Sequence, residues 1–150
     1  MSLRQTALWA IFVVACFHAA QTSAMAPADV RKHTVASLAN VPVMKEHHGR
    51  DFYKLFDKLG NAILLNVHVL ANTYDNEPVF RAFTGYVIDR HVTRGLEPVL
   101  WKEFWGYWKG FLENKGTTLS AEQKEAWDTL GKLFNEEAQA QLKKHGLPHV

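Results

Sequence analysis

His91 is the side chain in this sequence best placed to bind a metal ion or a cofactor. It follows an apolar helical face that includes Phe80, Phe83 and Val87. Steps of four residues place His91 almost directly above Val87 on that face. A histidine nitrogen at the edge of an apolar crevice is a suitable axial ligand for a haem iron. The residues alone leave a structural role open, which is the commoner role of a lone histidine.

Other kinds of chemistry find little support in the residue pattern. His47 and His48 lie beside Glu46 without a partner histidine one helical turn away, so a structural zinc site is not predicted. The chain has neither a Gly-rich phosphate loop nor a G-x-S-x-G motif, and no spacing supports a serine–histidine hydrolase. Charges of both signs are spread along the chain with a net charge of +2, so nucleic acid is not an expected partner.

The elements that must position His91 are helical. The 150 residues are 47% hydrophobic and 21% charged, which is ordinary for one soluble domain. No segment shows the alternation of a strand, so we predict an all-α fold. The expected helices cover residues 27–39, 43–56, 59–71, 77–91, 98–112 and 120–145.

The last two of these helices carry the strongest patterns. Residues 98–112 contain aromatic side chains on more than one face, which predicts a largely buried helix. Ser120 and Gln123 form a capping-box pattern before the final helix, and Gly146 and Pro148 follow its end. The expected inward face of this helix consists of Trp127, Leu130, Phe134, Ala138 and Leu142.

Residues 1–24 have the pattern of a secretory signal. Arg4 precedes the apolar run of residues 7–17, and small or polar residues follow as far as Ala24. The alternatives are an N-terminal membrane anchor and a buried first helix, although the run is short for a membrane span. Cleavage after Ala24 would remove Cys16, the only cysteine, and leave residues 25–150 as one secreted domain without a disulfide or a membrane anchor.

Several segments resemble the secreted, cuticular or extracellular globins of nematodes. The matching stretches are KLGNAILLNVHVLANTYDNEPVFRAF, DRH, LWKEFW, TLSAEQKEAW and KHGLPH, and GRDFYKLF resembles the second helix of that family. The resemblance implies a globin-like helical fold that binds haem b and uses its iron to bind dioxygen for transport or storage. It also implies a binding protein rather than an enzyme.

The resemblance assigns roles to five residues. His91 in DRH falls where the family has its proximal iron ligand, and Val87 lies one turn before it. Tyr53 in DFYKLF falls where these globins have a tyrosine that donates a hydrogen bond to bound dioxygen. Leu59 in KLG falls at the distal position and cannot donate, so Tyr53 would carry that role alone. Ile63, one turn later, is expected to pack on the distal haem face.

The sequence departs from the family between Phe56 and Leu59. About two dozen residues of an eight-helix globin plan are missing, namely the region of the C and D helices and the corner before the distal helix. On one continuous helix Tyr53 and Leu59 would lie about 120° apart around the axis and about 9 Å apart along it. We therefore predict a long or kinked fused helix and a distal pocket open to solvent. A genuine shortened variant and an error in the gene model both remain compatible with the gap.

Two alternative functions remain open, and the missing segment raises the first of them. The chain could be a helical interaction or lipid-binding protein in which haem binding is impaired or lost. Haem-based oxygen or nitric-oxide chemistry is the alternative from the enzyme class, and Leu59 gives it no particular support. The sequence also leaves self-association into a homo-oligomer open.

Overall fold

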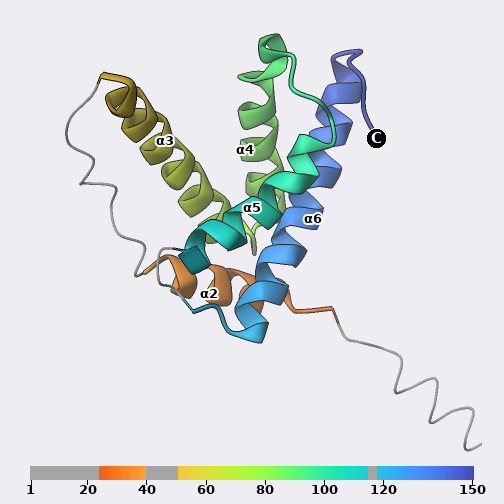
Figure 1. Cartoon of the computed structure of the whole chain (residues 1–150). Helices are drawn as coiled ribbons and strands as arrows, with labels where there is room; N and C mark the ends of the chain where they lie inside the picture. Colours follow the sequence, from red (N-terminus) through yellow and green to blue (C-terminus); the bar gives the residue numbers. More distant parts are fainter. Residues whose placement is uncertain (1–23, 40–50, 115–117) are drawn as a thin grey trace, which may run out of the picture.

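The computed structural model describes residues 24–39, 51–114 and 118–150, with only the backbone for residues 51–59, 61 and 114. These residues form α2 (Pro27–Leu38), α3 (Asp51–Thr73), α4 (Glu77–Asp89), the 3-10 helix η1 (Val92–Arg94), α5 (Leu100–Asn114) and α6 (Ala121–Lys144). No strand occurs among them, and the predicted all-α class is confirmed. In Figure 1, α5 crosses α6, α4 runs beside α6, and α2 lies across their lower ends.

Helix α6 is the longest helix among the described residues, and local sequence defines both of its ends. The Ser120 hydroxyl accepts a hydrogen bond from the Gln123 backbone N–H at 3.2 Å, and Gln123 Oε1 accepts one from the Ser120 N–H at 2.9 Å. This confirms the predicted capping box. At the other end, Gly146 adopts a φ of 68°, a conformation that suits glycine after a helix. The predicted inward face is also confirmed, since Trp127, Leu130, Phe134, Ala138 and Leu142 are all buried.

The centre of the core lies between α5 and α6. Trp127 is completely buried, and its indole N–H donates a hydrogen bond to the Ser37 hydroxyl of α2 at 2.9 Å. Trp105 stacks on Trp127 with ring centroids 5.9 Å apart. Trp105 also lies so close to Gly131 that a Cβ atom there would come within 2.7 Å of the indole ring. The two helices therefore approach closely because Gly131 has no side chain.

Helix α3 replaces two elements that the sequence pattern separates. The expected helices at residues 43–56 and 59–71 merge over the described residues into one helix from Asp51 to Thr73. The merger agrees with the predicted fused helix and has a simple cause, since neither proline nor a turn sequence interrupts residues 56–59. Residues 43–50 and the expected signal up to Ser23 lie outside the described residues. None of the described helices is long and apolar enough to cross a membrane.

Two further expectations need correction. The helix predicted over residues 77–91 ends at Asp89, so His91 lies in the turn before η1 rather than in the helix. The helix predicted over residues 98–112 runs from Leu100 to Asn114 and is less buried than expected. Trp101, Trp105 and Trp108 are buried in it, but Tyr107 is 73% exposed because that face of α5 has no covering element among the described residues.

Candidate functional site

His91 is held in place by its own backbone and by a tryptophan. Its backbone N–H donates to the Ile88 carbonyl at 2.8 Å, which continues the helical turn by one residue. Its ring nitrogen Nδ1 lies 2.7 Å from the Val87 carbonyl oxygen. Since a carbonyl oxygen can only accept, Nδ1 must carry the proton and donate it. In the neutral ring, Nε2 then keeps its lone pair free for a metal ion, which is the usual arrangement of a metal-binding histidine.

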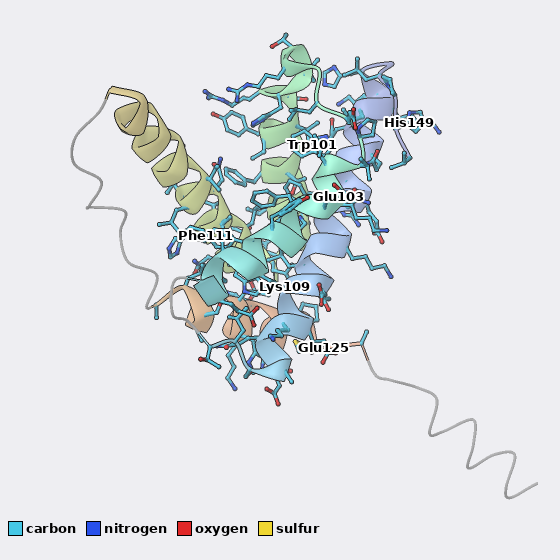
Figure 2. All side chains as sticks on the ribbon, viewed as in Figure 1. Trp101, Glu103, Lys109, Phe111, Glu125 and His149 are labelled. Carbon is cyan, nitrogen blue, oxygen red and sulfur yellow. The ribbon has the colours of Figure 1, made fainter. Side chains whose placement is uncertain are left out.

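Trp101 also limits the orientation of the His91 imidazole ring. The two rings meet edge to face, with centroids 5.5 Å apart and an interplanar angle of 89°. Trp101 in turn packs against Phe134 of α6 at 6.3 Å. Figure 2 shows Trp101 at the beginning of α5, on the side of α4. The position of His91 therefore depends on the α5–α6 core as well as on its own short turn.

A mostly apolar cavity of about 240 Å³ opens beside His91. Helices α3, α4, α5 and α6 and the segment after η1 contribute to its wall. The lining side chains are Ile63, Asn66, Val67, Leu70, Val87, His91, Leu96, Leu100, Trp101, Phe104, Trp105 and Phe134. None of them is an acid, a lysine or an arginine, so a charged part of any ligand has no counter-ion among these described residues.

The fold brings together three of the five predicted site residues. His91, Val87 and Ile63 all line the cavity, with Val87 buried and Ile63 44% exposed at its rim. Tyr53 and Leu59 belong to the continuous helix α3, but their side chains are not among those described. Along that helix their positions are about 120° apart, as the fused-helix prediction required.

The sequence pattern missed several lining residues. Asn66 lies three positions after Ile63 and four before Leu70, on the face that was predicted to point inward. A polar residue inside an apolar stripe was the available signal for it. Leu96 lies between η1 and α5, and Leu100 is the first residue of α5. Both line the cavity because of the path that the chain takes after His91. No periodic pattern predicts that contribution.

A bare metal ion would have too few protein ligands at this site. Among the described residues, no three His, Cys, Asp or Glu side chains lie close enough to hold a metal ion together. His91 could therefore bind a metal only if a cofactor supplied the other ligands. A flat apolar macrocycle with an iron centre meets this requirement.

Such a group would contact both the interior of the cavity and its rim. Its volume is below the range of about 300–1,000 Å³ that is usual for ligand pockets, so a macrocycle would extend beyond the enclosed space. The rim offers apolar surface for that part, because Ile63, Leu96 and Leu100 are each at least 40% exposed. No cation is among the described lining residues, so the carboxylates of a haem would find no counter-ion on that part of the wall.

Comparisons with known proteins identify the class of this helical fold. A solved structure of a globin-like protein of Caenorhabditis elegans, GLB-1, superposes with a TM-score of 0.75 at 34% identity and covers 84% of this chain and 99% of that one. A second structure of the same protein gives a TM-score of 0.72 at 32% identity. The fold is the all-helical globin fold.

The family follows from the sequence comparisons. The family model "Globin" matches residues 53–138, which is more than half of the chain. A myoglobin of Nippostrongylus brasiliensis is 48% identical and covers 82% of this chain and 99% of its own length. The cuticular globin isoform of the same nematode is 46% identical, covering 95% and 99%. The chain belongs to the globin family, with nematode globins among its relatives, and the family suggests haem-based oxygen binding by a protein that is not an enzyme.

Proposed function

We propose that this chain is a secreted globin that binds haem b through His91 and binds dioxygen for transport or storage. The observation that carries the proposal is the 2.7 Å hydrogen bond from His91 Nδ1 to the Val87 carbonyl, at the wall of an apolar cavity. It leaves Nε2 as a nitrogen ligand in a fixed orientation. When bound, a ferrous haem supplies an iron centre that can take up dioxygen reversibly.

The remaining residues would shape the site around that iron. Val87 and Trp101 would hold the imidazole against rotation, and Ile63 would cover the face opposite His91. The apolar lining would keep water from the enclosed part of the site, whereas the exposed rim at Ile63 would leave a ferrous iron accessible to water and prone to oxidation. Tyr53 remains a proposed hydrogen-bond donor to the bound gas through family resemblance, and Leu59 a proposed apolar contact. Their spacing on α3 argues against a shared contact with one small ligand.

We also propose that a segment is missing between the second helix and the distal helix of the family plan. The uninterrupted helix α3 supports this proposal. The comparison with the cuticular isoform extends over 174 positions, which exceeds the 150 residues of the chain and therefore requires gaps on its side. Inserting the corresponding segment of a related globin should raise haem affinity. Unchanged affinity would contradict the proposed effect of the missing segment.

Secretion is proposed from residues 1–24 and from the relatives. Two of these are named cuticular and extracellular globins. N-terminal sequencing of the protein exported by a eukaryotic secretory host should give Met25 as the first residue. An intact N-terminus, or retention inside the cell, would contradict this assignment.

The ligand role of His91 is tested by absorption spectroscopy of the mature chain after addition of haem. The parent chain should show a Soret band typical of histidine-bound haem, and His91→Gly should lose it and regain it on addition of free imidazole. His149→Gly is the matched control, because His149 Nδ1 also contacts a carbonyl, that of Leu147 at 3.0 Å, but His149 is not among the residues that line the cavity. An unchanged spectrum in His91→Gly would show that another residue binds the iron.

The main alternative is a helical protein that has lost haem binding. The small volume of the cavity and the exposure of Ile63 at its rim favour it. In that case the parent chain itself would show no Soret band after reconstitution.

A further inference from the structure

Asn66 and His91 are the polar side chains that can reach a ligand in the cavity. Two other lining residues, Trp101 and Trp105, carry an indole N–H, but both of these nitrogens are fully covered by neighbouring atoms. The other lining side chains are aliphatic or phenyl groups. His91 uses Nδ1 for the Val87 carbonyl, so it offers the cavity only Nε2. Among the described lining residues, the amide of Asn66 is therefore the remaining polar side chain.

The register of α3 fixes Asn66 in this position. Its neighbour Val67 is 1% exposed and Leu70 is 3% exposed, so the helix cannot rotate without uncovering both. Ile63, one turn earlier, lines the same cavity. Asn66 thus belongs to the α3 wall, whereas His91 comes from the turn after α4.

The Asn66 amide makes no hydrogen bond within the described part of the chain. Another amide of α3 is paired locally, since Asn72 donates to the His68 carbonyl at 2.9 Å. While the cavity is open, water can serve the Asn66 amide. Once an apolar macrocycle fills the cavity, that water is displaced and an unpaired amide becomes unfavourable unless the ligand supplies a partner.

We propose that the side-chain amide of Asn66 donates a hydrogen bond to a diatomic ligand bound on the α3 side of the site, opposite His91. This inference rests on the proposed haem-binding function. The amide NH₂ is a donor, and the partly negative oxygen of bound dioxygen is a good acceptor. Asn66 would then provide the polar contact that Leu59 cannot make and that the spacing of Tyr53 on one continuous helix makes difficult.

The test uses the haem-loaded mature chain and three variants. Asn66→Leu removes the polar group, and Asn66→Asp keeps the shape but lacks the NH₂ donor. Asn72→Leu is the matched control for Asn66→Leu. It makes the same asparagine-to-leucine change on the same helix but outside the cavity. The measurements are the dioxygen dissociation rate and the carbon–oxygen stretching frequency of bound carbon monoxide, which reports the local field of a donor.

Both Asn66 variants should release dioxygen about tenfold faster, as expected for the loss of one hydrogen bond. The stretching frequency should rise in Asn66→Leu and remain at the parent value in Asn72→Leu. Without haem, Asn66→Leu should unfold at the same or a higher temperature than the parent, because no native hydrogen bond is lost. If Asn66 had only a structural role, Asn66→Leu would instead lower the unfolding temperature of the haem-free chain.

The outcomes separate this inference from the function on which it rests. A normal haem spectrum together with unchanged dioxygen release and stretching frequency in Asn66→Leu and Asn66→Asp would overturn the role of Asn66 alone. Absence of a haem spectrum in the parent chain would overturn both the proposed function and this inference. Faster release in Asn72→Leu as well would also contradict the role of Asn66, since it would point to a general loosening of α3.

Discussion

The two walls of the cavity are built in different ways. The α5–α6 wall is a set of interlocked aromatic rings, in which Trp105 contacts Trp127 at 5.9 Å and Phe134 at 5.2 Å. The α3 wall is a single helix whose main partners are α2 and α4, and its Ile63 is 44% exposed. The first wall fixes the imidazole of His91 through Trp101, whereas the second offers a surface that a ligand can complete.

This difference assigns separate tasks to the two walls. A ligand atom for a metal needs a fixed orientation, which dense packing of large side chains provides. The α3 wall joins buried core residues such as Val67 and Leu70 to an exposed rim at Ile63, and the rim can change its contacts with a ligand at a smaller cost in folding stability. We therefore expect substitutions on the α5–α6 wall to act mainly on stability, and substitutions at the rim of α3 to act mainly on ligand binding.

The largest expected effect is that of Trp127→Ala. The substitution removes a completely buried indole together with its stacking on Trp105 and leaves the Ser37 hydroxyl without its donor. Large-to-small changes of this kind cost about 3–5 kcal/mol of unfolding free energy. Urea unfolding followed by circular dichroism measures the cost. Leu65→Ala on α3, where Leu65 is 65% exposed, should change the unfolding free energy by less than about 0.5 kcal/mol.

Much of the α5–α6 wall could be predicted from the sequence. The capping box at Ser120 and the apolar residues of α6 at spacings of three and four directly indicate a long amphipathic helix. The inward direction of Trp127 follows from the same pattern. Such features are local, so the sequence alone contains the information needed to place them.

The α3 wall was harder to predict for a physical reason. The merger of two helices depends on the absence of any breaker around Leu59, and it was expected once the short spacing to Phe56 was recognised. The place of Asn66 in the cavity wall was missed because a polar residue in an apolar stripe has no single interpretation until its neighbours in space are known. The contributions of Leu96 and Leu100 depend on how the chain turns after His91, which is a tertiary property.

The next prediction compares Leu70 with Ile63 on the same face of α3. Leu70 is 3% exposed, so Leu70→Ala should cost about 2–5 kcal/mol of unfolding free energy with or without haem. Ile63 is 44% exposed, so Ile63→Ala should have little effect on the haem-free chain. It should lower stability more clearly when haem covers the side chain. Thermal unfolding of both forms measures this difference. Equal costs for Ile63→Ala in the two forms would contradict the placement of haem against α3.

The smallest of these effects concerns a pair of helical glycines. In Gly131→Ala the added Cβ would lie within 2.7 Å of Trp105 Cγ and 3.0 Å of its Cβ. These atoms lie close to the backbone of Trp105, and its ring is packed against Trp127 and Phe134, so Trp105 cannot move aside freely. Overpacking of this kind costs about 1–3 kcal/mol.

Gly106→Ala on α5 should have the opposite sign. Apart from its own stretch of helix, no atom of the described residues lies within 4 Å of the Cβ that it would add, and alanine favours a helix over glycine by up to about 1 kcal/mol. Midpoints of thermal unfolding for the two variants compare the tight and the open face of the same helix pair. Stabilisation by both variants would contradict the close contact between Trp105 and Gly131. It would then also contradict the view that the α5–α6 wall is a rigid support for His91.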